Sequence, residues 1–276
     1  MSQISQIFNL SRRNLQISSA LMTFSFLICF ILSVSDFNKS LMLSIHSSSV
    51  LPSWFWSVMN LGGDAWVVLL VLLLADPRPG YLTSWIIKTW LLGALFVQSI
   101  KYFFPMPRPA SVLGVERLNL IDSPPLVSSS MPSGHALAAV SCGLILIALL
   151  KHRDFKFSTL LIVACVSCVA AWARVAVGAH WPSDVIAGAG LAVLALVIST
   201  YWELRSSWYQ WFRSTGGQIF LIVLHLLIAI HLLQPQSKLL IVQLVQFSLS
   251  AMSIYRAYFL LKELLSNSSL ISIKKS

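Results

Sequence analysis

Three short polar clusters interrupt a chain that is otherwise strongly apolar, and their side chains are of kinds that hold anions or move protons. The clusters occupy residues 101–109, 132–135 and 174–184. Their ionisable members are Lys101, Arg108, His135, Arg174, His180 and Asp184. Lysine and arginine neutralise anions, arginine through paired contacts, whereas histidine exchanges protons near neutral pH and aspartate can orient it. Together these residue types suit the chemistry of an anionic group.

Each of the first two clusters has a simpler explanation when it is considered alone. Lys101 and Arg108 follow an apolar run, where such side chains often extend along the lipid to reach the membrane surface. Ser133 before Gly134 fits an ordinary helix N-cap followed by a flexible residue. Ionisable groups at the ends of membrane helices are nevertheless costly, so their concentration favours a functional site.

The third cluster joins two apolar runs and contains a specific pair. His180 and Asp184 lie four positions apart, and Pro182 between them suits the first turn of a helix. Across that helix start, Asp184 can reach one imidazole nitrogen and determine which nitrogen stays unprotonated. A capping aspartate beside an unrelated histidine would be the simpler arrangement. Arg174 in the same cluster argues against it, because chance ionisable groups are disfavoured at a membrane face.

The composition of the chain is that of a polytopic membrane protein. Of its 276 residues, 57% are hydrophobic and 10% are charged, and the mean hydropathy is +0.80. The net charge of +10 does not favour a nucleic-acid partner, because basic residues of membrane proteins collect on the cytoplasmic side. All cysteines lie within apolar runs, so we expect small buried side chains rather than ligands. They are Cys29, Cys142, Cys165 and Cys168.

Eight apolar runs approach or reach the length of about 20 residues that a helix needs to cross a bilayer. They are Ile17–Ser35, Ala65–Ala75, Thr83–Phe104, Ala136–Leu150, Phe157–Val177, Asp184–Tyr201, Ile219–Leu233 and Leu239–Leu261. The second is long enough only if its helix begins near Trp54, which places Gly62, Gly63 and Asp64 inside it. The first is expected to be a retained anchor. The expected fold is all-α, a polytopic membrane bundle with a six-helix core and two C-terminal spans.

The distribution of basic residues predicts the orientation of these spans. With a cytoplasmic N-terminus, the cytoplasmic side receives Arg12, Arg13, Arg78, Lys88, Lys151, Arg153, Lys156, Arg205, Arg213, Lys262, Lys274 and Lys275. The other side receives Lys39, Lys101, Arg108, Arg117, Arg174 and Lys238. This is a positive-inside bias, and it directs all three polar clusters to the outer face.

In this order and spacing, the three clusters resemble the three-part signature of the type 2 phosphatidic acid phosphatase (PAP2) and vanadium haloperoxidase superfamily. Six residues separate Lys101 from Arg108, residues 132–135 read PSGH, and five residues separate Arg174 from His180. Any one part is a weak signal, whereas their joint occurrence is highly specific. One departure is Ala173, because the pattern usually has a serine before the arginine of the third part.

The resemblance covers residues 54–201 and divides the chain into three parts. Residues 1–53 would form an N-terminal cytoplasmic segment, the first transmembrane helix and an outer loop, and residues 202–276 two additional transmembrane helices and a basic tail. Nothing in the sequence indicates a role for these two helices or an oligomeric state. Residues 110–130 form a loop of a length that usually has a function, and we expect it to cover the site and to select headgroups.

The resemblance implies a membrane-bound lipid phosphatase. His180 would be the nucleophile that forms a phosphohistidine, Asp184 would orient it, and His135 would be the general acid. The phosphate would be held by Lys101, Arg108, Ser133, Gly134 and Arg174. No metal or other cofactor is implied. We expect an integral protein of the bacterial inner membrane whose site faces the periplasm and whose partners are the bilayer and a lipid phosphate.

Several alternatives stay open from the sequence. The lipid is an isoprenoid diphosphate, a phosphatidic acid-type phospholipid or a lipid A phosphate, and nothing in the residues chooses among them. The same site would serve a phosphotransferase that passes the phosphoryl group to a second lipid instead of to water. A haloperoxidase would bind vanadate there, although the many spans argue against it. A lipid-binding or transport protein without turnover is the interpretation from a different class, and Ala173 is the feature that favours it.

Overall fold

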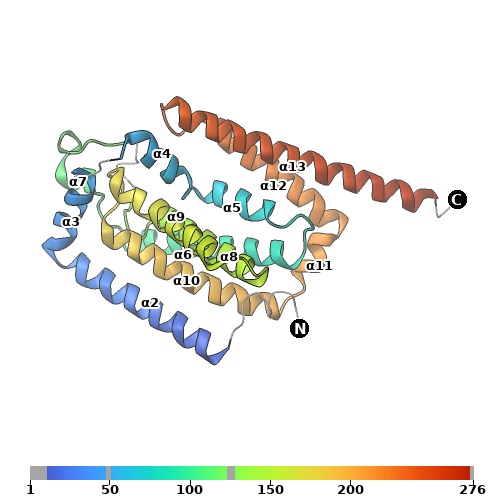
Figure 1. Ribbon diagram of the computed structural model, residues 1–276, viewed down its shortest axis with the longest axis horizontal. Helices are drawn as coiled ribbons and strands as arrows, with labels where there is room; N and C mark the ends of the chain where they lie inside the picture. Colours follow the sequence, from blue (N-terminus) through green and yellow to red (C-terminus); the bar gives the residue numbers. More distant parts are fainter. Residues whose placement is uncertain (1–10, 48–50, 123–127, 274–276) are drawn as a thin grey trace.

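The computed structural model describes residues 11–47, 51–122 and 128–273, with side chains up to residue 266. These residues form helices joined by turns and contain no strand, which confirms the all-α fold (Figure 1). The helices are α2 (Arg12–Ser33), α3 (Asp36–Ser47), α4 (Ser53–Leu61), α5 (Ala65–Leu74), α6 (Tyr81–Phe103), α7 (Pro109–Leu113), η1 (Val115–Arg117), α8 (Gly134–His152), α9 (Phe157–Ala176), α10 (Pro182–Leu204), α11 (Trp208–Arg213), α12 (Thr215–Leu233) and α13 (Leu240–Ile273). Residues 1–10 of the predicted N-terminal segment and the end of the basic tail at 274–276 lie outside the described residues.

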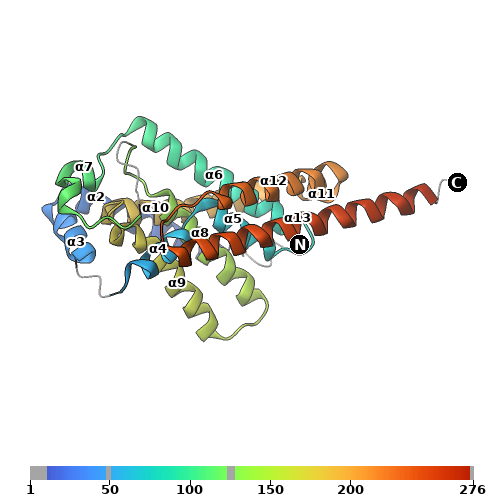
Figure 2. The ribbon, with the colours of Figure 1, turned by 90° about the horizontal axis from the view of Figure 1, so that it is seen from above.

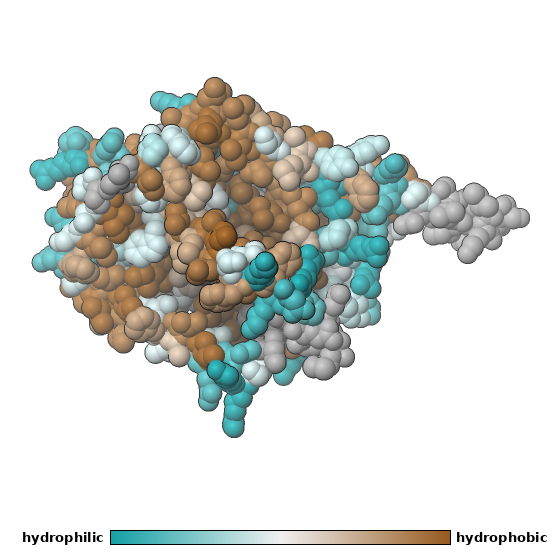
Figure 3. Space-filling model, viewed as in Figure 1, coloured by the Kyte–Doolittle hydropathy of each residue, from teal (hydrophilic) through white to brown (hydrophobic). Residues whose placement is uncertain are grey.

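Most of the long helices have the length and composition of membrane spans. Among the described helices six meet both criteria, namely α2, α8, α9, α10, α12 and α13, and the α4–α5 pair is a seventh if it counts as one broken span. The third predicted span, α6, has the necessary 23 residues but is less apolar, because it buries Lys88 and several hydroxyl side chains. Apolar side chains cover much of the face seen in Figure 3, as contact with lipid requires. The protein is therefore integral to a membrane.

The second predicted span is not one continuous helix. α4 and α5 meet at an angle of 64°, because residues 62–64 interrupt the helix between them. The Asp64 carboxylate caps α5 and accepts a hydrogen bond from the Trp66 backbone N–H at 2.9 Å. A Cβ on Gly63 would lie 3.1 Å from the His135 carbonyl oxygen. The prediction of an unbroken helix is wrong, and the break lets α4 and α5 approach the start of α8.

α10 runs through the bundle and contacts α2, α6, α8 and α9 (Figure 1). Small residues allow close packing at its crossing with α8. A Cβ on Gly188 would lie 2.4 Å from the Ser133 carbonyl oxygen, so the two helices are almost in backbone contact there. A Cβ on Gly93 of α6 would likewise lie 2.7 Å from the Leu137 side chain. These crossings position the N-terminal end of α8.

A buried ion pair links α6 to α10 at the opposite end of the bundle. The ammonium of Lys88 lies 2.5 Å from Oε2 of Glu203, and both side chains are almost fully buried. The Ser84 hydroxyl donates to the same carboxylate oxygen. The rings of Trp202 and Trp208 lie 5.4 Å and 5.2 Å from the ammonium. Buried charges need such partners, so this pair specifies how α6 and α10 align.

α12 and α13 form a helix pair that packs on the α4–α5 side of the bundle (Figures 1 and 2). Polar contacts join the two helices: Nδ1 of His225 lies 3.1 Å from the Ser253 hydroxyl, and the Ser250 hydroxyl donates to a carbonyl of α12 at 3.0 Å. Arg256 of α13 donates to the Pro77 carbonyl oxygen at 2.8 Å, beyond the end of α5. The two additional helices are thus part of the packed bundle.

The prediction that every cysteine is a buried side chain is wrong for two of them. Cys29 is buried and Cys142 is partly buried, whereas Cys165 and Cys168 are exposed on α9. A membrane helix can direct one apolar face to lipid rather than to protein, and cysteine behaves there as a small apolar side chain. An apolar run therefore does not indicate which face of its helix packs against other helices and which face is exposed.

Candidate active site

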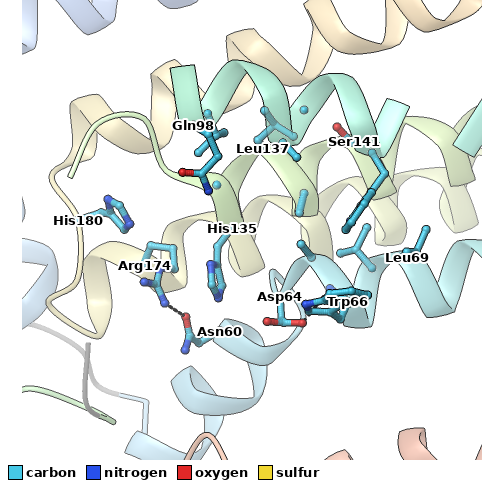
Figure 4. A pocket seen from close by; sticks show the side chains of 18 of the residues that line it. Asn60, Asp64, Trp66, Leu69, Gln98, His135, Leu137, Ser141, Arg174 and His180 are labelled. Carbon is cyan, nitrogen blue, oxygen red and sulfur yellow. Dashed lines mark hydrogen bonds between the residues drawn. The ribbon is translucent and has the colours of Figure 1, made fainter. Parts of the chain in front are cut away.

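A cavity of about 750 Å³ lies where α6, α8 and the α9–α10 connection converge on α4 and α5. Of the eight predicted site residues, six line this cavity. They are Lys101, Arg108, Gly134, His135, Arg174 and His180. Figure 4 shows His180, Arg174 and His135 around one common space. The fold thus brings together three polar clusters that are distant in the sequence.

His180 lies between α9 and α10, and both of its ring nitrogens have polar neighbours. Nδ1 lies 3.2 Å from Oδ2 of Asp184, which also accepts hydrogen bonds from the Ser130 hydroxyl at 2.5 Å and the Trp181 backbone N–H at 2.9 Å. A carboxylate at Nδ1 keeps the proton on that nitrogen, which leaves Nε2 unprotonated. Nε2 lies 3.4 Å from Nη1 of Arg108.

Burial and charge keep the imidazole of His180 neutral. The side chain is 2% exposed. Loss of hydration lowers the pKa of His180 well below its ordinary value, and the positive charges of Arg174, Arg108 and Lys101 lower it further. A neutral imidazole retains the lone pair on Nε2 that a nucleophile requires.

Arg108 is held in place by neutral groups on the cavity wall. Its Nη1 donates to the Ala179 carbonyl oxygen at 2.9 Å. Its Nε donates to the Ser128 carbonyl oxygen at 3.0 Å, and its Nη2 to the Ser128 hydroxyl at 2.9 Å. Because these partners carry no charge, the guanidinium charge is available to an anion in the cavity.

Arg174, in the last turn of α9, has one donor bound and one donor without a partner. Its Nη1 donates to Oδ1 of Asn60 on α4 at 2.5 Å. Its Nε is buried and finds no acceptor within the part of the chain that the structure describes. A buried N–H without an acceptor is costly, so this donor is available to an acceptor that binds beside Arg174.

The start of α8 adds donors to the same cavity. The Ser133 hydroxyl caps the helix by accepting from the Ala136 backbone N–H at 3.3 Å, and Gly134 and His135 follow as the first helical residues. A helix N-terminus carries partial positive charge and unpaired N–H groups. Lys101, in the last turn of α6, lines the cavity with them. An anion bound here would meet cationic side chains and a helix N-terminus.

The comparisons with known proteins agree with this geometry. The sequence pattern of the PAP2 superfamily matches residues 81–208, a range that contains all three polar clusters. Residues 81–208 thus resemble the PAP2 superfamily. Its fold is similar to the crystal structure of Aquifex aeolicus LpxE, with a TM-score of 0.50 and 25% sequence identity, and the match covers 61% of this chain and 97% of that chain. No curated protein sequence matches the chain.

Two of the predicted site residues lie behind the cavity wall. Asp184 is 1% exposed and reaches the cavity only through His180. Ser133 is fully buried, with its hydroxyl in the helix cap and its backbone N–H donating to the Asp184 carbonyl oxygen at 3.0 Å. A direct contact between the Ser133 hydroxyl and a phosphate stays a prediction, while its capping role is visible.

Other residues of the candidate site were not singled out from the sequence. Ser128 and Ser130 stand in the same polar break as the PSGH motif, so that break was the available signal. Asn60 contacts Arg174, which lies 114 positions later in the sequence, and no local pattern reveals such a contact. Ala173, where the superfamily pattern usually has a serine, is fully buried. The neighbouring Arg174 is held by Asn60 of α4.

The cavity continues into the bundle as an apolar arm. Figure 4 shows Leu69 and Leu137 on the side of His135 that faces away from His180. Further apolar side chains of α5, α6 and α8 line this arm, including Leu72, Ile86, Trp90 and Ile145. One cavity therefore offers a cationic end and an apolar end.

Part of the loop at residues 110–130 borders the cavity. It contains most of α7 and all of η1, and its residues Ile121, Asp122 and Ser128 contribute to the lining. The Ser57 hydroxyl donates to the Asp122 carboxylate at 2.9 Å, which attaches the loop to α4. Residues 123–127 lie outside the described residues, and the selection of headgroups by this loop stays a prediction.

Proposed function

We propose that the protein is an integral membrane phosphatase that hydrolyses a lipid phosphate or lipid diphosphate through a phosphohistidine intermediate. The observation that carries this proposal is the arrangement of His180. Its Nδ1 faces Oδ2 of Asp184, and its Nε2 lies beside Arg108 in a cavity lined by cationic side chains. Attack on phosphorus requires a neutral, oriented imidazole next to a site for the anion.

In the first step, Nε2 of His180 attacks phosphorus in line with the oxygen that joins it to the lipid. The P–N bond forms as the P–O bond breaks, and the leaving oxygen takes a proton from protonated His135. Asp184 accepts a hydrogen bond from Nδ1–H and stabilises the positive charge that develops on the imidazole. The products are a phosphohistidine and a lipid alcohol, or a lipid monophosphate when the substrate is a diphosphate.

In the second step, water replaces the histidine. His135, now neutral, removes a proton from water as the water oxygen attacks phosphorus. The new P–O bond forms as the P–N bond breaks, and the electron pair of that bond returns to Nε2 of His180. Inorganic phosphate leaves, and His135 holds the proton that the next turnover needs.

The cationic groups would hold the non-bridging oxygens of the phosphoryl group during both steps. Lys101, Arg108 and Arg174 supply charge, and the Gly134 backbone N–H supplies a donor at the helix start. Because charge spreads over these oxygens in the transition state, donors fixed in advance stabilise it without further reorganisation. Ser133 would support this group by capping the same helix start. The scheme uses neither a metal nor another cofactor.

The apolar arm supports a lipid as the substrate. With the phosphate among the cations, the chain would extend between α5 and α6 toward Leu69, Leu72 and Ile86. Each buried CH₂ group contributes about 0.8 kcal/mol, so a long chain would bind much better than a water-soluble phosphate ester. Isoprenoid diphosphates, phosphatidic acid-type phospholipids and lipid A phosphates all combine an anionic group with long chains.

We further propose that the site faces the periplasm across a bacterial inner membrane. The α8–α9 turn, at the opposite end of these helices from His180, carries Arg153 and Lys156, and Lys151 lies in the last turn of α8. Cytoplasmic turns carry such an excess of basic residues. The arrangement therefore supports an outward-facing site that water reaches from outside.

The test is the release of inorganic phosphate by the purified protein in detergent from a panel of lipid phosphates. Release is expected in the presence of a chelator and without an added lipid acceptor. His180→Ala should abolish release while the protein still inserts in membranes. Strict dependence on a lipid acceptor would favour the phosphotransferase. Lipid binding without any release, unaffected by His180→Ala, would favour a protein without turnover.

A further inference from the structure

The cavity has a second polar region that is separate from the cationic end. Its lining includes Asp64 at the start of α5, His231 in the last turn of α12 and Gln236 in the α12–α13 connection. Figure 4 shows Asp64 on the opposite side of His135 from His180. His231 and Gln236 lie beyond residues 81–208, so they are outside the part of the chain that the superfamily pattern matches.

The three polar side chains of this region are close to one another. Nε2 of His231 lies 3.6 Å from Oδ2 of Asp64 and 2.9 Å from the amide nitrogen of Gln236. The other carboxylate oxygen of Asp64 accepts from backbone N–H groups of α5. The ring of Trp66 lies 5.6 Å from the His231 imidazole. The region therefore combines a carboxylate, an imidazole and an amide beside an aromatic ring.

The turn that carries Gln236 is held in place by side chains of α13. Gln246 is fully buried, accepts from the Gln236 backbone N–H at 3.3 Å and donates to the Gln234 carbonyl oxygen at 3.3 Å. Gln243 donates to the Ser237 carbonyl oxygen at 3.0 Å. A buried amide with both of its polar groups bonded specifies one local conformation. The position of Gln236 at the cavity is thus built into the α12–α13 pair.

The chemistry of this region differs from that of the cationic end. The Asp64 carboxylate would repel a second phosphate. Its Oδ2 can accept hydrogen bonds, the Gln236 amide can donate and accept, and the His231 imidazole can do either according to its tautomer. The face of Trp66 can pack against the C–H groups of a carbon skeleton. A neutral, hydroxyl-bearing skeleton such as glycerol or a sugar fits this set of groups.

We propose that Asp64, His231 and Gln236 form a headgroup subsite that binds a hydroxyl group of the substrate on the carbon skeleton next to the phosphoester. This proposal rests on the proposed function of the cavity as a lipid phosphatase site. It gives α12 and α13 the role of determining which lipid phosphates are preferred. Lipids with a glycerol or sugar headgroup are favoured over isoprenoid phosphates, which carry no hydroxyl group at that place.

The test compares two substrates that differ by a single hydroxyl group, the hexadecyl ether of glycerol phosphate and hexadecyloxypropyl phosphate. His231→Ala is expected to lower the ratio of kcat/KM for the hydroxylated over the deoxy substrate by roughly 5- to 10-fold, the effect of one or two hydrogen bonds. Asp64→Asn should lower the same ratio while it keeps the α5 cap, because asparagine caps helices as well as aspartate does. His152→Ala, at an exposed position at the far end of α8, should leave both rates unchanged.

An acylated glucosamine phosphate, assayed beside the glycerol ether, distinguishes the two sources of the hydroxyl group. The substrate whose kcat/KM falls more in His231→Ala identifies the source. An unchanged ratio in both variants, with wild-type phosphate release intact, would overturn the subsite and leave the phosphatase proposal standing. A wild-type protein that releases phosphate from none of the substrates would overturn the proposed function, and the subsite with it.

Discussion

Nε2 of His180 and Nη1 of Arg108 lie 3.4 Å apart inside the cavity, so the proposed nucleophile and an anion-binding group share one position. A phosphate drawn to Arg108 would therefore arrive beside the atom that attacks it, which is the advantage of proximity in catalysis. The same positive charge lowers the pKa of His180 and keeps its lone pair available. In this arrangement, the positive charges that would bind the phosphate also keep the imidazole of the proposed nucleophile unprotonated.

The pH dependence of kcat/KM should reveal how the neighbouring positive charges lower the pKa of His180. Protonation removes the lone pair of His180, so activity should fall as the pH drops through its pKa in the free enzyme, below the ordinary histidine value of about 6.5. Lys101→Met removes a cation that lowers this pKa, so the acid limb should move to higher pH. A limb that stays in place or moves to lower pH would contradict the electrostatic account.

Asp184→Asn should lower kcat by about one-hundred- to ten-thousand-fold, because an amide in place of the carboxylate no longer holds the proton on Nδ1 of His180. The substitution keeps the size of the side chain, so thermal unfolding should change little in comparison. The measurement is kcat at saturating lipid phosphate. Asp36→Asn, at an exposed position of α3, is the matched control and should behave as wild type. A kcat of Asp184→Asn within a few-fold of wild type would argue against the orienting role.

Asn60→Ala should lower kcat/KM by roughly 10-fold, because Arg174 loses the partner that fixes its guanidinium. Asn60→Asp has the same size and should be worse, since a carboxylate would neutralise Arg174 and compete with the substrate phosphate. Steady-state kinetics on one lipid phosphate is enough to rank the variants. If Asn60→Asp were the more active of the two, Asn60 would not act by positioning Arg174.

Gly188→Ala should destabilise the protein by about 1–3 kcal/mol, because the new methyl group would meet the Ser133 carbonyl oxygen at 2.4 Å. Activity should fall as well, since the displaced start of α8 carries Gly134 and His135. Gly216→Ala is the matched control, because its Cβ would find its nearest neighbour at 3.8 Å. Unfolding in detergent compares the two variants, and equal stabilities would contradict the close crossing of α8 and α10.

Much of the fold could be predicted from the sequence because its signals are local. The apolar runs predict the long helices, and the combination of Pro182 with Asp184 predicts the start of α10 close to where it begins. The break between α4 and α5 was misjudged, although Gly62 and Gly63 mark it. Gly63 also lies against the His135 backbone, a contact with a distant part of the chain that no local pattern reveals.

The candidate site was predictable only where a motif marked its residues. The three polar clusters predicted the residues that line the cationic end of the cavity. The catalytic and binding roles of these residues stay predictions. Asn60 was not considered, and His231 was interpreted as structural or interfacial, because each contacts a distant helix and neither belongs to a motif. The placement of α12 and α13 against α5 was likewise invisible in a pattern of apolar residues.

The most direct test of the account is to trap the phosphoenzyme. The wild-type protein is mixed with a lipid phosphate carrying a labelled phosphoryl group, quenched in alkali, in which phosphohistidine is stable, and digested for mass spectrometry. The account predicts a phosphoryl group on His180 that forms and decays at rates compatible with turnover, and no such group in His180→Ala. Phosphate release at the full rate in His180→Ala, or turnover by the wild type with no phosphoryl group on His180, would contradict it.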